Sequence, residues 1–216
     1  MLVLPLVLTM ALSVDSVPVR RLVVCGIDRS GSAYSMREDA VYECARVLAK
    51  AGSGDEVIVR WISERSYAAT ERVVHLRVPE APRVCGSRMD VPCSRAYAQW
   101  ETRAAAAKRA AVARLLAAPI VRAPATDIRG FLQSASEAAT AAPAGVQREV
   151  RIVTDGFDNL QQKIAPDLQG VVISIVMLQV ESAVARSLAT REVWKEYFRA
   201  HGAVEVNIYP AEGKPR

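Results

Sequence analysis

Short apolar runs alternate along this chain with longer segments in which apolar residues recur at helical spacing. Continuous apolar runs are typical of strands that are buried on both faces of a sheet. Such runs lie at residues 20–27, 55–63, 148–155, 169–178 and 203–210. Segments with helical periodicity lie at residues 36–52, 94–118, 126–140 and 190–202. We therefore predict that strands and helices alternate through most of the chain.

One further strand has a different pattern. In residues 70–78, Val74, Leu76 and Val78 alternate with polar or charged positions such as His75 and Arg77. Alternation of this kind indicates a half-exposed strand at the edge of a sheet. Together with the strand–helix alternation, it predicts an α/β fold, a doubly wound, Rossmann-like and mostly parallel sheet with one antiparallel edge strand.

The size and charge of the chain limit the classes of function that it can have. The chain has 216 residues, of which 51% are apolar, so one domain with a substantial core is expected. The net charge is +5, but the positive residues are spread along the chain and only 6% of residues are aromatic. A nucleic-acid-binding protein usually concentrates its basic residues and adds stacking aromatics. We therefore expect no nucleic-acid partner, only a mild attraction to acidic surfaces.

The first 19 residues form an apolar leader that is too short to cross a bilayer comfortably but has the length of a signal-peptide core. We expect a secreted, periplasmic or cell-envelope protein with no stable membrane span. Because no Lys or Arg precedes Arg20, a cytoplasmic location stays open. Residues 20–212 are expected to form the domain, with an insertion around 79–118.

Four cysteines agree with export. Cys85 and Cys93 bracket a polar loop that contains proline, and we predict a disulfide between them. Cys25 lies in an apolar strand and Cys44 on the apolar face of the next helix. We expect these two to be free thiols in the core.

Acidic and hydroxyl side chains gather where predicted strands end or helices begin. They are Asp28, Ser30, Ser32, Thr126 and Asp155. Parallel strands with right-handed connections place these loops at one end of the sheet, where ligands of doubly wound sheets bind. Oxygen ligands without His or Cys suit Mg²⁺, Mn²⁺ or Ca²⁺ rather than zinc or copper.

The ordered segments "DRSGS" (28–32), "TD" (126–127) and "TDG" (154–156) resemble the metal-ion-dependent adhesion site of von Willebrand factor A-type (vWA) domains. The resemblance covers roughly residues 20–210 and extends to uncharacterised secreted bacterial members of that superfamily. It implies that Ser30, Ser32 and Thr126 are hydroxyl ligands, and that Asp28 and Asp155 act directly or through water. It also implies an open coordination position for an acidic side chain of a protein partner.

Two other functions compete with this adhesion-type binding. Magnesium-dependent phosphatases of the haloacid-dehalogenase type have the motif Asp-x-Asp after the first strand. This chain has Asp28-Arg29-Ser30 there and so lacks the second carboxylate. Neither His75 nor His201 is placed to activate a serine nucleophile. We therefore do not expect an enzyme. The remaining alternative is a cytosolic vWA scaffold that acts with an ATPase or chaperone partner.

Overall fold

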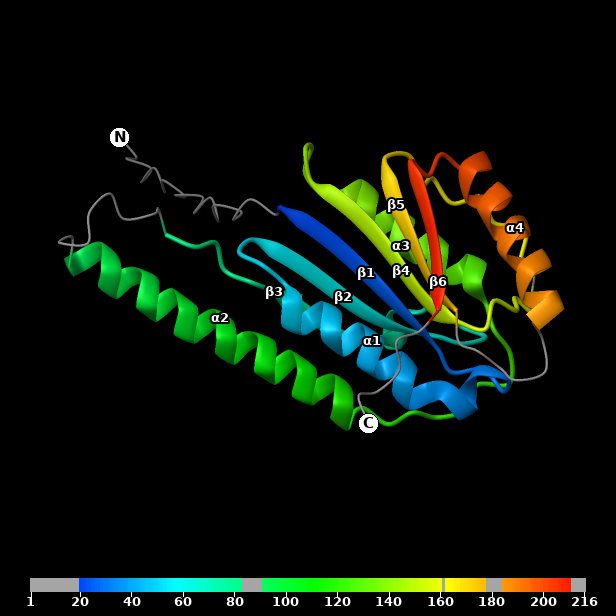
Figure 1. Ribbon diagram of the computed structural model, residues 1–216, viewed down its shortest axis with the longest axis horizontal. Coiled ribbons are helices and arrows are strands. Elements are labelled where there is room, and N and C mark those ends of the chain that lie inside the picture. The colour runs from blue at the N-terminus through cyan, green and yellow to red at the C-terminus, as the bar shows by residue number, and fades with distance from the viewer. Residues whose placement is uncertain (1–19, 83–90, 161, 178–183, 211–216) are drawn as a thin grey trace, which may run out of the picture.

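A single six-stranded sheet organises the computed structural model, which describes residues 20–82, 91–160, 162–177 and 184–210. The strand order is β3-β2-β1-β4-β5-β6, and β3 is antiparallel to β2 while all other neighbours are parallel (Figure 1). The strands are β1 (Arg21–Asp28), β2 (Asp55–Ile62), β3 (Arg72–Arg77), β4 (Gln147–Thr154), β5 (Val171–Met177) and β6 (Glu205–Pro210). The predicted doubly wound α/β sheet with one antiparallel edge strand is confirmed.

Helices cover both faces of the sheet (Figure 1). One face packs against α1 and α2, and the opposite face packs against α3 and α4. The helices are α1 (Arg37–Lys50), α2 (Val91–Ala117), α3 (Ile128–Ala141) and α4 (Val184–Ala200), with short 3₁₀ helices η1 (Ala33–Met36) and η2 (Ala69–Glu71). Burial on both faces is the reason that β1 and β5 are almost entirely apolar.

Two helices begin earlier than the sequence pattern predicts. Helix α2 begins at Val91 rather than at Ser94, because proline is tolerated in the first turn of a helix and Pro92 lies there. Helix α4 begins at Val184 rather than at residue 190, in a segment rich in the good helix formers Ala, Arg and Leu. Helix α2 belongs to the predicted insertion at 79–118, and it packs against α1 and β3 on the outside of the molecule (Figure 1).

The strand order reverses between β1 and β4. Helix α1 carries the chain from β1 to β2 on one side, whereas β4 enters on the other side of β1 after α3. In open α/β sheets such a reversal creates a crevice at the carboxyl ends of the two strands. Asp28 ends β1 and Thr154 ends β4, so the predicted site residues of both loops lie at this crevice.

A disulfide joins Cys25 of β1 to Cys44 of α1. The expectation of two free thiols in the core is therefore wrong. Both residues are fully buried on the faces by which β1 and α1 pack together, and this packing brings their Cα atoms to 6.1 Å. That separation is within the range of ordinary disulfides.

Some sequence predictions fall outside the described residues. These are the leader at 1–19 and Cys85, the first partner of the predicted Cys85–Cys93 bond. Among the residues that the structure describes, no helix combines the length and the hydropathy needed to cross a bilayer.

Removing the Cys25–Cys44 bond should destabilise the fold. The bond closes a loop with a sequence separation of 19 residues, for which the loss of chain entropy in the unfolded state corresponds to about 3 kcal/mol. We expect Cys25→Ala/Cys44→Ala to have a free energy of unfolding in urea that is lower than that of the oxidised wild type by that order. Compared with the wild type under reducing conditions, in which the bond is absent, the variant should lose much less. An equal loss under both conditions would show that packing, and not the bond, is responsible.

Candidate metal centre

Asp28 is the centre of the site at the crevice between β1 and β4. Its side chain is fully buried, and both of its carboxylate oxygens accept hydrogen bonds. Oδ1 accepts from the backbone N–H of Ser30 at 2.8 Å, an arrangement that Asp readily makes in turns. Oδ2 accepts from the Thr154 hydroxyl at 2.6 Å, across the β1–β4 boundary. The carboxylate is thus held between the two strands.

Backbone hydrogen bonds tie the segment before α3 to both neighbouring loops. The N–H of Ala123 donates to the carbonyl of Arg29 at 2.9 Å, and Ser30 and Ala123 form a parallel bridge. The carbonyl of Thr126 accepts from the N–H groups of Asn159 and Leu160, both at 3.2 Å. The three sequence segments that the motif comparison singled out therefore meet at one place.

Asp155 follows directly after β4 and is also buried. Its Oδ1 accepts from the N–H of Phe157 at 3.1 Å, and the N–H of Gly156 donates to the Thr154 hydroxyl oxygen at 3.0 Å. Gly156 has a φ of 87°, a left-handed conformation that favours glycine. Oδ2, the other carboxylate oxygen of Asp155, makes no hydrogen bond to a described residue and could bind a ligand.

Three buried oxygens at this site have no hydrogen-bond partner among the described residues. They are Ser30 Oγ, Thr126 Oγ1 and Asp155 Oδ2, one from each of the three segments. Buried polar groups are almost always paired, because leaving one unpaired costs roughly 1–3 kcal/mol. Since the three segments meet at the crevice that contains Asp28, these oxygens indicate a place for a ligand that accepts lone pairs from oxygen.

Ser32 differs from the other four predicted ligands. It is exposed and precedes η1, and its side chain makes no capping hydrogen bond there. The structure therefore brings Asp28, Ser30, Thr126 and Asp155 together in the interior and leaves Ser32 at the surface. As metal ligands, all five stay a prediction.

The electrostatics of the site are unfavourable to an ionised Asp28. The pKa of Asp28 is raised from 3.8 to about 6, mainly by burial and to a smaller extent by the nearby charge of Asp155. Hydrogen bonds from Thr154 and from the Ser30 backbone oppose this rise. The Ser30 hydroxyl also favours the charged form, being close to the carboxylate without reaching hydrogen-bonding geometry. A positive charge beside these two acids would relieve the cost.

Sequence reasoning gave no role to three residues that support the site. Thr154 was visible only as part of the "TDG" motif, yet its hydroxyl links the two strands. Asp127 caps α3, accepting from the N–H of Gly130 at 2.8 Å, and its other oxygen accepts from Gln162 at 3.0 Å. The indole N–H of Trp194 on α4 donates to the carbonyl of Gly156 at 2.9 Å. No local pattern shows that last contact, since it spans 38 residues.

The donor set consists mostly of hydroxyl groups. In the part of the chain that the structure describes, no group of three or more His, Cys, Asp or Glu side chains could hold a metal ion. The candidate site contains two carboxylates, and its remaining oxygens come from Ser and Thr. Such a set suits a hard cation that keeps water or an outside ligand, rather than zinc or copper.

Comparison with known proteins rests on structure alone. No protein-family model matches this chain, and no curated protein matches it. The pilus adhesin SpaC from Lactobacillus rhamnosus GG is 12% identical over 92% of this chain and 29% of its own, with a TM-score of 0.52. Its open conformation gives a TM-score of 0.50 at 12% identity, over 89% and 28% of the two chains. Proximal thread matrix protein 1 from the mussel byssus is 16% identical over 89% and 44%, with a TM-score of 0.47.

The fold is vWA-like. Together with the strand order, the similarity to SpaC agrees with the resemblance seen in the motifs. At these identities the likeness concerns the fold alone. This chain spans less than half the length of the adhesin or of the byssus protein.

Replacing Asp28 by Asn should stabilise the protein when divalent cations are absent. The raised pKa means that ionising Asp28 costs the folded state more than the unfolded state, so wild-type stability is lost as the pH rises from 3.8 through about 6. We expect Asp28→Asn to unfold at higher urea in EDTA at neutral pH, by up to about 3 kcal/mol, less the cost of turning the Thr154 hydroxyl so that it accepts from the new amide. The advantage should vanish below pH 3.8. Asp167→Asn, at an exposed carboxylate, should show no such dependence.

Replacing Trp194 by Phe should loosen the turn that carries Asp155. Phenylalanine keeps the ring packing against Phe198 but removes the N–H that binds Gly156, at a cost of about 1 kcal/mol. We expect faster hydrogen exchange at the Phe157 amide, which the turn holds on Asp155. Tyr197→Phe, which loses a hydrogen bond to Ile164 instead, is the control. Equal effects of both variants would indicate general loosening of α4.

Proposed function

We propose that this chain is a non-enzymatic, adhesion-type binding domain that holds an acidic group of a partner protein through a divalent cation. The cation is Mg²⁺, or Mn²⁺ or Ca²⁺ in its place. Asp28, Ser30, Ser32, Thr126 and Asp155 would hold it. When bound, such a cation offers an open coordination position to a carboxylate from outside.

The observation that carries this proposal is the set of unpartnered oxygens of Ser30, Thr126 and Asp155. Their segments meet at the crevice that contains Asp28, a buried carboxylate whose ionisation is disfavoured. One divalent cation would satisfy the oxygens and stabilise both charged acids. With two carboxylates in the set, the occupied site would be close to neutral, and its uncharged hydroxyl ligands would leave the cation a coordination position for an acidic ligand.

The surroundings of the two histidines support a binding role rather than hydrolysis. His75 pairs with Glu56 on the β2–β3 edge at 2.6 Å, and His201 contacts the carbonyl of Tyr197 at 2.7 Å at the end of α4. Neither contacts Asp28 or Ser30, so neither is placed as a base for these residues. The binding role also fits the name of the adhesin SpaC, whose fold this chain shares.

We also propose that the domain works outside the reducing cytoplasm. The Cys25–Cys44 disulfide is of the kind that persists in secreted and envelope proteins and is rare in the cytosol. It favours the exported domain over the cytosolic scaffold. Export of a reporter fused to residues 1–19 would separate the two.

Divalent cations should stabilise the folded protein. A ligand present at a hundred times its dissociation constant adds about 2.7 kcal/mol, which corresponds to a rise in melting temperature of several degrees for a domain of this size. We expect that rise for the wild type with Mg²⁺ or Mn²⁺ relative to EDTA. Thr126→Ala should lose most of it, because the variant lacks one of the unpartnered oxygens.

Ser136→Ala is the matched control. Ser136 is also buried, but its hydroxyl donates to the carbonyl of Asp167 away from the site. The variant should lower the melting temperature in EDTA yet keep the full rise with cation. If the wild type shows no rise with Mg²⁺, Mn²⁺ or Ca²⁺, and calorimetry detects no binding, cation-dependent adhesion must be abandoned.

A further inference from the structure

Arg29 lies between two of the candidate metal ligands, Asp28 and Ser30, in the loop after β1. The chain is extended there. The N–H of Arg29 donates to the carbonyl of Ile62 at 3.2 Å, and its carbonyl accepts from the N–H of Ala123 at 2.9 Å. Successive side chains of an extended chain point to opposite faces. The side chain of Arg29 is therefore turned away from the face on which Asp28 and Ser30 lie.

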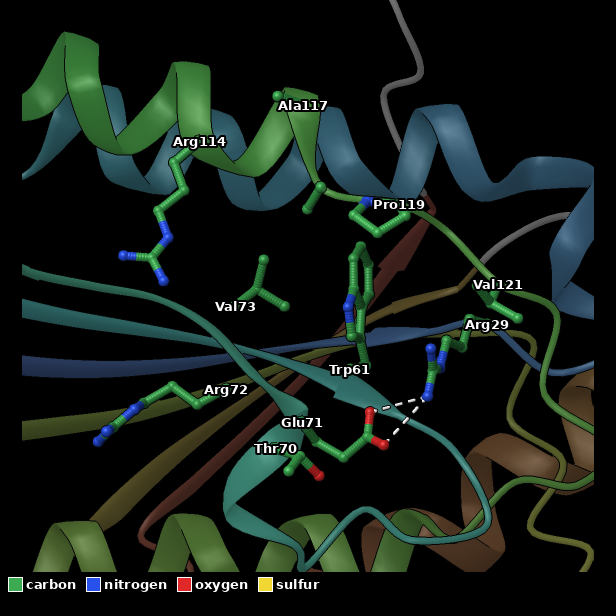
Figure 2. A pocket seen from close by; sticks show the side chains of 11 residues that line it. Arg29, Trp61, Thr70, Glu71, Arg72, Val73, Arg114, Ala117, Pro119 and Val121 are labelled. Carbon is green, nitrogen blue, oxygen red and sulfur yellow. Dashed lines mark hydrogen bonds and ion pairs between the residues drawn. The ribbon is translucent and has the colours of Figure 1, made fainter.

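On that other face, the side chain of Arg29 ends on Glu71 of η2. Nη2 of Arg29 donates to both carboxylate oxygens of Glu71, each at 3.0 Å. Figure 2 shows the pair in a groove of about 550 Å³ between the carboxyl end of α2 and the strands β2 and β3. The two side chains are only 16% and 7% exposed. The pair thus attaches the loop after β1 to the segment that precedes β3.

The backbone of Arg29 also connects this loop to the segment that supplies Thr126. Ala123, whose N–H binds the carbonyl of Arg29, is buried and forms a parallel bridge with Ser30. Arg29 therefore contacts β2 through its N–H, the segment before α3 through its carbonyl, and η2 through its guanidinium. A shift of this one residue would move hydroxyl ligands on two segments.

The loop has a reason to rotate if it is not held. Asp28 is fully buried, and burial disfavours its ionised form. Turning the loop toward water would hydrate the carboxylate and lower that cost. Such a rotation would swing the side chain of Arg29 inward and break its contact with Glu71. The ion pair on one face therefore opposes the exposure of the acid on the other.

A buried ion pair is suited to holding an orientation. Its net contribution to stability is small, because the loss of hydration of both charges offsets much of their attraction, and apolar side chains of similar volume often replace it without loss. Its charge-assisted hydrogen bonds nevertheless require one arrangement of the two groups. Stability and orientation can therefore be separated by replacing both partners together.

We propose that Arg29 is a positioning residue of the metal centre, whose ion pair with Glu71 keeps the side chains of Asp28 and Ser30 turned toward the cation. Arg29 itself does not touch the cation. The proposal rests on the function proposed above, and it adds the group that sets how firmly the site is preformed. Residues that orient metal ligands in this way typically change metal affinity about 10- to 100-fold when they are replaced.

The test compares two variants of this pair with the wild type. Arg29→Met/Glu71→Leu replaces both charges by apolar groups, and Glu71→Gln is a milder change that keeps one acceptor oxygen. The control is Arg21→Met/Glu149→Leu, which removes the ion pair of Arg21 and Glu149 at the opposite end of β1.

Two quantities are measured on each full-length protein. The first is hydrogen exchange of the Ser30 amide in EDTA, since this amide donates to Oδ1 of Asp28. Exchange of the Ile152 amide, in the middle of β4, reports opening of the sheet and serves as the reference. The second quantity is the dissociation constant of Mn²⁺ alone, measured by calorimetry.

We expect the Ser30 amide of Arg29→Met/Glu71→Leu to exchange about tenfold faster relative to Ile152, and Mn²⁺ to bind about tenfold more weakly. Glu71→Gln should lie between this variant and the wild type, and the control should match the wild type in both quantities. If the ratio of the two exchange rates is the same in both variants and in the wild type, the proposal is overturned. It is also overturned if Mn²⁺ binds the double variant as tightly as the wild type, or if the control weakens Mn²⁺ binding equally.

The proposal and the function on which it rests fail in different ways. If the wild type binds no Mn²⁺, the cation-dependent function falls, and the exchange of the Ser30 amide in EDTA alone decides whether Arg29 positions the loop. If the wild type binds Mn²⁺ and the variants of the pair keep both its affinity and its exchange rates, the cation site stands and the role of Arg29 falls.

Discussion

The hydrogen bond from the Thr154 hydroxyl to the Asp28 carboxylate joins the two strands between which the sheet order reverses. It requires a fully buried acid, and that burial raises the pKa of Asp28 to about 6. In the segments that meet here, the hydroxyls of Ser30 and Thr126 have no hydrogen-bond partner among the described residues. The site therefore has buried acids without a compensating positive charge and buried hydroxyls without hydrogen-bond partners. A divalent cation is suited to interact with both.

The fold produces this arrangement from distant parts of the chain. Because α3 returns the chain to the free side of β1, β4 becomes the neighbour of β1 and its terminal loop meets the β1 loop. The segment before α3 crosses the same end of the sheet and adds Thr126. Helices α2 and α4 lie on opposite faces of the sheet. Helix α4 supports the site through the hydrogen bond from Trp194 to the carbonyl of Gly156.

Local patterns in the sequence predicted the parts of this structure that depend on neighbouring residues. Apolar periodicity located the strands, and acids at strand ends identified Asp28 and Asp155, because parallel strands must end on the same side of the sheet. Features that depend on how two elements meet were missed. The Cys25–Cys44 bond depends on the rotation of α1 against β1, and the exposure of Ser32 depends on where η1 begins. A groove lined by Arg29, Trp61 and Arg114 (Figure 2) also depends on how two elements meet, since it follows from the docking of α2 on β3.

The central claim is that oxygens from three segments bind one hard cation at the carboxyl end of β1 and β4. Crystals grown with Mn²⁺ test it most directly, because manganese is located by its anomalous scattering independently of any model. The account predicts one peak in contact with oxygens of Ser30, Thr126 and Asp155, and no peak there in crystals of Thr126→Ala. A map without a peak at this place in crystals that contain Mn²⁺, or with manganese bound only elsewhere on the chain, would contradict it.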